Sequence, residues 1–210
     1  MSHPDSPLLV AFVRLLCGAH PRWVGCGPAA VQRIYVANHG SHLDTLVIWS
    51  ALPPELRERT RPVAAADYWS RGIRRRLAER VFRAVLIPRG AADGVAAARE
   101  AGARAAVERT ASALDSGDSL ILFPEGTRTR GPEVGPFKAG IWHLCRMRPQ
   151  VDVVPVWLDN LKRVLPKGEF APVPFVVGVT FGSPTRLADG EAKEPFLDRL
   201  RAAVIDLGQR

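Results

Sequence analysis

The segment from Asn38 to Asp44, of sequence NHGSHLD, contains the residue types of an acid–base site. It follows an apolar run typical of a β-strand and precedes a helical pattern. His39 and Asp44 would not share a face of one helix, because five steps turn about 500°, or about 140° net. With His39 in the loop and Asp44 on the first helical turn, the carboxylate can orient one imidazole nitrogen and leave the other as a base for a hydroxyl. Such a pair lacks the serine of a hydrolase triad, so the substrate itself must bring the nucleophile.

The same segment also has a structural interpretation. Ser41 and Asp44 form the S-x-x-D pattern of a capping box, in which both side chains satisfy N–H groups at a helix N-terminus. A histidine and an aspartate at this spacing also occur by chance. The residues alone leave both interpretations open, and His42 is expected on the surface near the helix N-terminus.

A second polar cluster follows the apolar run 119–123, where the chain continues as PEGTRTR. Gly126 can adopt a backbone conformation closed to other residues, and Arg128 offers a planar guanidinium that matches a phosphate or a carboxylate. Lys138, at the start of a predicted helix, could add another cation. The alternative is a β-turn followed by an exposed basic loop, with Lys138 simply solvated.

Two further strand ends extend the pattern. LIPRG at 86–90 places Arg89 directly after a strand. VVPVW at 153–157 indicates a buried strand in which Pro155 is confined to an edge or a bulge, and plain core is the favoured interpretation of this run on its own. Four strand ends followed by polar clusters together predict a histidine base beside a pocket for an anionic, phosphorylated substrate.

Apolar strand-like runs alternate with helical ones, which predicts an α/β domain with a central mixed or parallel sheet covered by helices. One domain is expected over 1–210, with a short amphipathic helix within 1–20 and a motif-bearing core over 33–181. The expected strands are 33–38, 62–66, 84–88, 119–123, 151–157 and 173–181, and the expected helices are 7–18, 41–52, 68–82, 92–116, 137–147 and 191–207.

Composition excludes several classes of protein. With 47% hydrophobic and 24% charged residues, the chain can bury a core. Three cysteines without a CxxC pair favour neither a disulfide framework nor a zinc ribbon, and they fit a reducing compartment. There is no G-x-S-x-G elbow, no P-loop and no metal-ligand spacing. The GCGPAA run at 25–30 precedes a strand instead of opening a helix, so it is not a dinucleotide site.

Positive charge is concentrated between Arg57 and Arg83. The chain has a formal net charge of +8, and this segment holds nine arginines against three acidic residues. Such a segment is typical of a surface that faces an anionic partner, although a solvated arginine-rich helix explains it equally well. The longest apolar run near the N-terminus, 7–17, contains Arg14 and is shorter than the roughly 20 residues of a spanning helix. It lacks the features of a signal peptide.

The motifs, taken in order, resemble those of the glycerolipid acyltransferase family, and within it the bacterial lysophosphatidate acyltransferases. They are NHGSHLD, IPRG at 87–90, FPEGTR at 123–128 and VPV at 154–156. The match runs from about Arg33 to Phe181. The NH-x4-D and FPEGTR pair, in this order, is a specific signal.

The resemblance implies a role for each matched residue. His39 would be the general base that deprotonates a glycerol hydroxyl, and Asp44 would orient it and stabilise the imidazolium. The family's fold is an α/β acyltransferase domain without a metal or cofactor, and acyl-coenzyme A or acyl carrier protein is the co-substrate. Acceptor and phosphate binding would fall to Arg89, Glu125, Gly126, Thr127, Arg128 and, as a secondary candidate, Lys138.

The expected reaction moves a fatty acyl group from a thioester to the free hydroxyl of lysophosphatidate, giving phosphatidate, in phospholipid biosynthesis. The same chemistry on glycerol 3-phosphate or another lysophospholipid is an alternative. A non-catalytic basic module that binds lipid or nucleic acid is more distant, and no nucleic acid is expected because no reading motif is present.

Family members commonly carry an apolar N-terminal hairpin or spanning segment, whereas this chain shows one short helix. A peripheral, monotopic attachment to an anionic membrane surface, on its cytoplasmic face, is therefore expected, without a transmembrane helix. The segment 158–170 has no assigned role.

Overall fold

The described residues form a mixed sheet of seven strands at the centre of the protein. The computed structural model describes residues 6–18, 20–67, 69, 72–88, 96–128, 133–159 and 177–209. The strand order is β1-β7-β6-β2-β5-β3-β4, and all neighbours are parallel except the antiparallel pair β6 and β7. This confirms the expected central mixed sheet. The strands are β1 (His20–Trp23), β2 (Arg33–Ala37), β3 (Thr60–Ala65), β4 (Val85–Ile87), β5 (Ser119–Leu122), β6 (Asp152–Leu158) and β7 (Gly178–Phe181).

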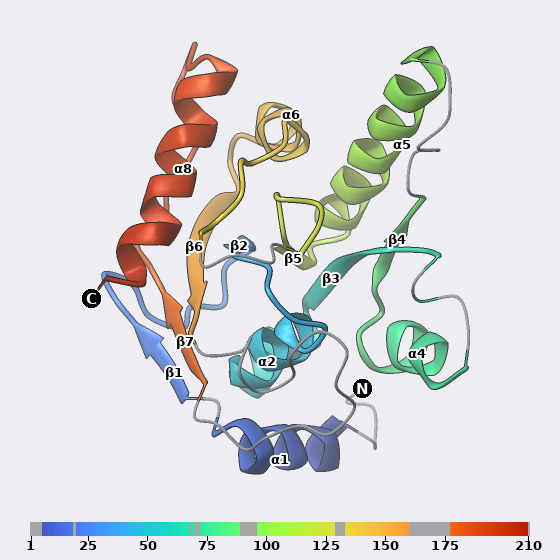
Figure 1. The fold of residues 1–210 in the computed structure, drawn as a ribbon, viewed down its shortest axis with the longest axis vertical. Helices are drawn as coiled ribbons and strands as arrows, with labels where there is room; N and C mark the ends of the chain where they lie inside the picture. The colour runs from blue at the N-terminus through green and yellow to red at the C-terminus, as the bar shows by residue number, and fades with distance from the viewer. Residues whose placement is uncertain are drawn as a thin grey trace.

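Helices cover both faces of the sheet (Figure 1). Along β2, Tyr35 and Ala37 join the hydrophobic cluster of one face, whereas Ile34 and Val36 join that of the other. Burial on both faces explains why these strands are continuous apolar runs in the sequence. The first face is covered by α1 (Ser6–Cys17) and α2 (Asp44–Ala51), and the second by α5 (Ala96–Asp115), α6 (Gly140–Met147) and α8 (Lys193–Leu207).

The parallel strands end at one common edge of the sheet. Val36 of β2 lies opposite Leu122 of β5 and Pro155 of β6, so these three strands end at nearly the same level. Because β7 runs the opposite way, it begins at this edge, where the N–H of Asp159 donates to the carbonyl of Gly178 at 3.0 Å. The segments that follow β2 and β5 are therefore neighbours in space.

Some short elements have no clear pattern in the sequence. The edge strand β1 has the sequence HPRW and three exposed residues. The helix α3 (Pro54–Glu58) has five residues and starts at a proline. Neither shows the apolar periodicity on which sequence prediction depends. The expected helix 41–52 begins only at Asp44, and the expected helix 68–82 contains α4 (Gly72–Arg76) followed by a π-helical turn, η1 (Leu77–Val81).

Pro155 lies at a bulge inside the sheet. Its strand, β6, lies between β2 and β7, so the edge alternative is wrong. Val153 pairs with Thr185, and Val156 pairs with Phe181. Between these pairs, two residues of β6 (154–155) lie opposite three residues of the partner segment (182–184). This confirms the bulge alternative, because the absent proline N–H is tolerated where the ladder is interrupted.

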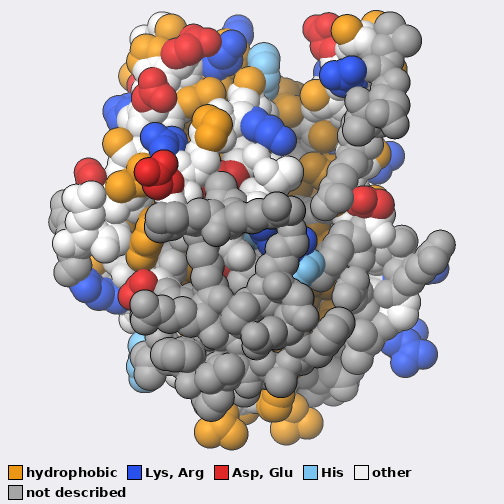
Figure 2. Space-filling model, viewed as in Figure 1, with side chains coloured by type: hydrophobic (Ala, Val, Ile, Leu, Met, Phe, Trp, Pro, Cys, Tyr) orange, Lys and Arg blue, Asp and Glu red, His pale blue; other side chains and the backbone are white. Residues whose placement is uncertain are grey.

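The helix α1 carries apolar side chains on two faces. Val10 and Val13 are buried in the cluster that includes α2. Leu8, Phe12 and Leu15 are 78%, 59% and 86% exposed and follow the i, i+4, i+7 spacing of one helical face. Hydrophobic side chains project from the lower end of the molecule in Figure 2, where Figure 1 places α1. Within the described ranges, no helix is long and apolar enough to cross a membrane.

Two arginines hold the C-terminal carbonyls of α2. Arg57, which is 9% exposed, donates to the carbonyls of Trp49, Ser50 and Leu52 at 3.2, 3.5 and 2.8 Å. Arg14 of α1 donates to the Ser50 carbonyl at 3.0 and 3.2 Å. Burial, and then the neighbouring Arg14 charge, lower the pKa of Arg57. The two cations satisfy carbonyls that lack intrahelical partners and complement the helix dipole.

Two further arginines of the basic segment contact one carboxylate. Arg61 and Arg83 form ion pairs with Asp118, which is 6% exposed, at 3.0 and 3.3 Å. These contacts link β3 and the turn after η1 to the start of β5. The cationic surface of this segment is therefore smaller than its nine arginines indicate.

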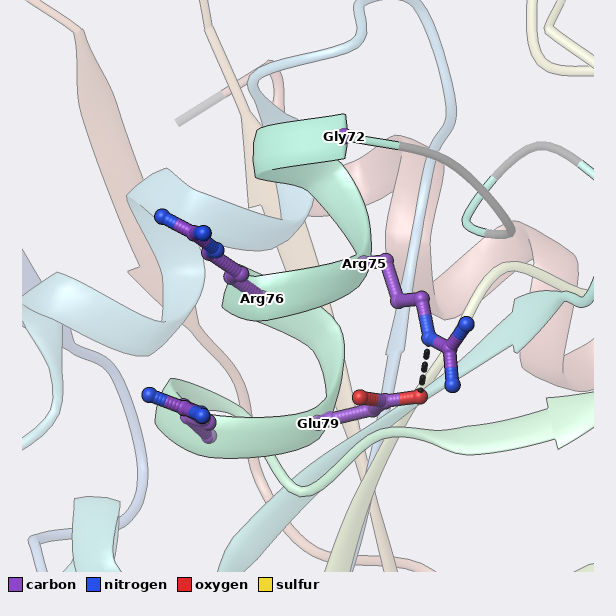
Figure 3. A pocket seen from close by; sticks show the side chains of 5 residues that line it. Gly72, Arg75, Arg76 and Glu79 are labelled. Atoms are coloured by element: carbon purple, nitrogen blue, oxygen red, sulfur yellow. Dashed lines mark hydrogen bonds and ion pairs between the residues drawn. The ribbon is translucent and has the colours of Figure 1, made fainter.

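The exposed part of the basic segment lies along α4 and η1. Arg75 pairs with Glu79 at 2.8 Å, and Figure 3 shows this pair on one side of α4 with Arg76 directed away from it. Arg76 and Arg80 are exposed, and both line a shallow surface depression together with the pair.

Replacing Arg57 with alanine is expected to lower the free energy of unfolding by about 3 kcal/mol, since charge-assisted hydrogen bonds are lost and buried carbonyls remain unsatisfied. Urea unfolding measures the change. Arg59→Ala, at an exposed neighbouring position, is the control and is expected to change stability by less than about 0.5 kcal/mol. Equal losses in the two variants would contradict the role given to Arg57.

Candidate active site

The segments after β2 and β5 meet at the carboxyl edge of the sheet. The backbone N–H of His39 donates to Oε1 of Glu125 at 2.8 Å, across 86 positions of sequence. Arg89, which the sequence predicts at this site, lies outside the described residues. Most of the segment 158–170, which has no assigned role, lies outside them as well.

Asn38 fixes the point at which β2 ends. Its side-chain amide donates to the carbonyl of Leu158 at 3.1 Å and accepts the N–H of the same residue at 2.8 Å. This pair extends the contact between β2 and β6 beyond the pairing of Ala37 with Val156. Sequence reasoning gave Asn38 no role, although its place directly before His39 in the motif was a signal.

His39 and Asp44 form a close pair. Nδ1 of His39 lies 2.7 Å from Oδ2 of Asp44, with the imidazole 21% exposed and the carboxylate 1% exposed. His39 lies in the loop and Asp44 is the first residue of α2, as the sequence predicts. A carboxylate at this nitrogen holds the ring in one orientation and selects the tautomer that carries its proton on Nδ1.

Only half of the Ser41–Asp44 capping box forms, and no described side chain caps the N-terminus of α2. Oδ2 accepts the backbone N–H groups of Gly40 at 2.7 Å and Ser41 at 3.0 Å, in addition to the imidazole. The Ser41 hydroxyl accepts the N–H of Leu43 at 3.2 Å. One carboxylate therefore ties the loop to the start of α2 and orients the histidine. Its second oxygen, Oδ1, is buried without a hydrogen-bond partner in the described part of the chain.

An aromatic ring supports the imidazole from the other segment. Phe123 stacks on His39, with ring centroids 4.3 Å apart and an interplanar angle of 22°. Together with the Asp44 contact, this leaves the imidazole little rotational freedom. Sequence analysis gave no role to Phe123, although it is the first residue of FPEGTR.

Glu125 lies beneath the exposed turn and does not point into solvent. It is 4% exposed, and its two carboxylate oxygens accept the N–H groups of His39 at 2.8 Å and Gly135 at 2.9 Å. Both hydrogen bonds go to backbone. In this structure Glu125 joins His39 to the segment before α6, and its contact with the acceptor stays a prediction.

The remaining residues of the predicted acceptor block lie together on the exposed side. Gly126 has a φ of +70°, and a Cβ built on it would stand 2.5 Å from Nζ of Lys138, so the lysine side chain lies directly over this glycine. Lys138 also donates its backbone N–H to the Pro124 carbonyl at 2.9 Å. Thr127 and Arg128 are exposed on the same turn.

Other possible reactive groups are poorly suited to chemistry. Among the side chains that the structure describes, no group of three or more His, Cys, Asp or Glu is arranged to hold a metal ion. Burial raises the pKa of the Cys145 thiol to about 12, and it also raises the pKa of Cys26, whose Sγ donates to the Gly182 carbonyl at 3.0 Å. Neither thiol is activated as a nucleophile.

A strand-end histidine held by a buried carboxylate, beside an exposed turn with a hydroxyl and cations, is suited to activating a hydroxyl next to an anionic group. The sequence profile of the Acyltransferase family matches residues 27–159, more than half of the chain. The chain therefore belongs to the Acyltransferase family, which confirms the resemblance drawn from its motifs.

Individual relatives match parts of the chain. The 1-acyl-sn-glycerol-3-phosphate acyltransferases of Cocos nucifera and Limnanthes douglasii are 29% identical over 90 residues and 43% identical over 61 residues. These segments cover 42% and 28% of this chain, but only 29% and 21% of the relatives. The 1-acyl-sn-glycerophosphate (LPA) acyltransferase PlsC from Thermotoga maritima shares the fold, with a TM-score of 0.66 and 20% identity over 90% of this chain and 72% of that one.

Substituting alanine for Gly126 or for Gly117 is expected to lower the free energy of unfolding by about 1–2 kcal/mol, because both glycines have positive φ angles, +70° and +81°. Their surroundings differ, since a Cβ at Gly117 meets open space whereas one at Gly126 meets Lys138. Only Gly126→Ala should therefore displace the lysine, which NMR detects as a shift of the ¹³C-methylated Lys138 signal. An unchanged signal would contradict the contact.

Proposed function

We propose that this protein is a lysophosphatidate acyltransferase, which moves a fatty acyl group from a thioester to the free glycerol hydroxyl of lysophosphatidate and so forms phosphatidate. The observation that carries the proposal is the 2.7 Å contact between His39 Nδ1 and Asp44 Oδ2, beside the exposed FPEGTR turn. Membership of the Acyltransferase family and the names of the matching relatives support the same reaction.

The chemistry follows from the fixed orientation of His39. With Nδ1 held by Asp44, Nε2 is the nitrogen that takes the proton from the acceptor hydroxyl. The hydroxyl oxygen attacks the thioester carbonyl, a new ester C–O bond forms, and the C–S bond breaks. The proton then passes from the imidazolium to the leaving thiolate, so the reaction consumes no other reagent.

Asp44 stabilises the charge that this step creates. Its carboxylate is 1% exposed, and Oδ1 has no hydrogen-bond partner among the described residues. A buried negative charge beside the ring stabilises the positive charge that develops when Nε2 takes the proton of the acceptor hydroxyl. The same carboxylate holds the loop by two backbone hydrogen bonds, so the ring need not reorient when it becomes charged.

The acceptor phosphate is assigned to the exposed side of the turn. Arg128 and Lys138 supply positive charge, and Thr127 supplies a hydroxyl. Gly126 has no side chain, so a ligand can approach its backbone closely. Arg89 shares that charge in this proposal. Glycerol 3-phosphate and other lysophospholipids carry phosphates that would suit the same cations, so they remain alternative acceptors.

The acyl donor is acyl-coenzyme A or acyl carrier protein. Both donors are anionic: coenzyme A carries phosphates, and acyl carrier protein has an acidic surface. The exposed Arg76 and Arg80 on α4 and η1 offer a cationic surface for either donor.

His39→Ala is expected to lower kcat by about 10²–10⁴-fold, because it removes the general base. Acceptor-dependent thiol release measures this, with acyl-coenzyme A and acyl carrier protein as alternative donors and lysophosphatidate in mixed micelles. His42→Ala, at an exposed neighbouring position, is the control and should keep its activity within about twofold.

The same assay distinguishes the alternatives. Thiol release from only one of the two donors identifies the acyl donor. Faster thiol release with glycerol 3-phosphate than with lysophosphatidate would identify glycerol 3-phosphate as the acceptor. Release from neither donor with any of these acceptors, or release that His39→Ala leaves intact, would contradict acyl transfer through this site and favour the non-catalytic lipid- or nucleic-acid-binding module.

Attachment to a membrane surface is the second part of the proposal. Leu8, Phe12 and Leu15 form an exposed apolar stripe on α1, whose other face packs on the domain. Such a stripe suits a helix that lies at the acyl boundary of a bilayer, with basic residues near anionic headgroups. In this proposal the protein is peripheral, on the cytoplasmic face of the membrane.

Replacing Leu8, Phe12 and Leu15 together with serine is expected to weaken binding to phosphatidylcholine vesicles that contain phosphatidylglycerol by at least about 10-fold, because apolar area no longer enters the bilayer. Vesicle flotation measures binding. Val31→Ser, which changes a half-exposed apolar residue outside α1, is the control and should bind as the unsubstituted protein does. Equal binding by all three proteins would contradict the role of α1.

A further inference from the structure

The helix α8 reaches the segment before α6 through one arginine. Arg201 donates from Nε to the carbonyls of Val134 and Gly135, both at 3.1 Å, and from Nη2 to the Val134 carbonyl at 2.6 Å. Val134 is 5% exposed, so water has little access to replace these hydrogen bonds. A planar guanidinium that binds two successive carbonyls fixes their relative orientation.

That segment is bonded in turn to the FPEGTR turn. The Gly135 N–H donates to Oε2 of Glu125, and the Lys138 N–H donates to the Pro124 carbonyl, both at 2.9 Å. Residues 133–138, which we call the bridging loop, therefore lie between α8 on one side and the turn after β5 on the other.

Glu125 completes the connection to the base. Its Oε1 accepts the backbone N–H of His39 at 2.8 Å, and its side chain is buried. A continuous series of hydrogen bonds thus runs from Arg201 through Gly135 and Glu125 to the backbone of His39. This series ends at the backbone of His39, whereas Asp44 holds the His39 ring.

We propose that Arg201 is a positioning residue of the active site, which holds the bridging loop so that Glu125 can fix the backbone of His39. Arg201 lies outside residues 27–159, the range matched by the family profile. Its consequence for catalysis rests on the proposed acyl transfer, whereas its consequence for the loop can be measured without any substrate.

Removing the guanidinium would release the carbonyls of Val134 and Gly135. As the bridging loop moves, Oε2 of Glu125 loses its backbone donor, so the carboxylate is no longer held in one orientation. Its rotation moves the N–H of His39 that Oε1 accepts. Misplacing a reacting group by about 1 Å can cost about 100-fold in rate.

The same helix offers a matched control. Arg199 also makes several hydrogen bonds, from its guanidinium to Glu191, Thr185 and the carbonyl of Arg186. These partners lie between β7 and α8, away from the bridging loop. Arg199→Ala therefore removes a comparable set of contacts from α8 without interrupting the connection to Glu125.

The first test is backbone amide hydrogen exchange, measured by NMR on the full chain without substrate. Arg201→Ala is expected to lower the protection of the His39 and Gly135 amides by at least about 10-fold, because both donate to Glu125. Protection of the Tyr35 amide in the core strand β2 should stay within about twofold, which separates a local change from global destabilisation. Arg199→Ala should leave all three amides unchanged. Unchanged His39 protection in Arg201→Ala, or equal losses in the two variants, would overturn the proposal.

The second test is thiol release under saturating donor. Arg201→Ala is expected to lower kcat by about 10-fold or more while the KM of the acceptor changes by less than about twofold, since no acceptor contact is removed. The kcat of Arg201→Lys should lie between that of Arg201→Ala and that of the unsubstituted protein. Added guanidinium ion should restore part of the activity of Arg201→Ala. Should Arg201→Ala fail to fold, Arg201→Lys carries both tests.

The two tests separate two kinds of failure. If Arg201→Ala alters hydrogen exchange of the His39 and Gly135 amides but leaves kcat unchanged, the positioning role is overturned. A loss of kcat that is relieved neither in Arg201→Lys nor by added guanidinium ion would overturn it as well. If the unsubstituted protein transfers no acyl group, the proposed function fails, and the exchange experiment still decides whether Arg201 holds His39 in place.

Discussion

The hydrogen bonds accepted by one buried oxygen, Oδ2 of Asp44, are the constraint on which the site depends. The His39 ring and the N–H groups of Gly40 and Ser41 all donate to it, so the loop must fold around the N-terminus of α2. The helix must in turn be fixed at its other end, where Arg14 and Arg57 hold the last carbonyls. An eight-residue helix gains little stability from its own hydrogen bonds, so α1 and α3 take part in placing the Asp44 carboxylate.

The FPEGTR segment divides into a supporting half and an exposed half. Phe123 stacks on the imidazole and Glu125 accepts two backbone N–H groups, whereas Thr127 and Arg128 face solvent. The left-handed conformation of Gly126 separates the two halves. One short motif can therefore hold His39 in place with one half and present a hydroxyl and a cation to solvent with the other.

Sequence predicted the arrangement of strand ends well, because β2, β5 and β6 are buried on both faces and form unmistakable apolar runs. It also predicted that His39 and Asp44 meet, although it could not show that one carboxylate both holds the backbone of the loop before α2 and orients the ring. The roles of Glu125, Arg57 and Arg201 were missed for a common reason. Their partners are backbone groups, which every residue has, so no pair of residue types marks the contact. The short elements β1 and α3 were missed because they lack apolar periodicity.

The reversal of direction between β6 and β7 has an evolutionary consequence. The hydrogen bond from Asp159 to Gly178 joins the end of one strand to the start of the other at the edge that carries the base. The register of the sheet therefore does not depend on how many residues separate these anchor points. Lengthening a closed loop costs only about 0.6 kcal/mol per doubling in chain entropy. Insertions and deletions between Asp159 and Gly178 can therefore accumulate during evolution while His39 and Asp44 stay where they are, because loops tolerate changes of length far better than the strands that they connect.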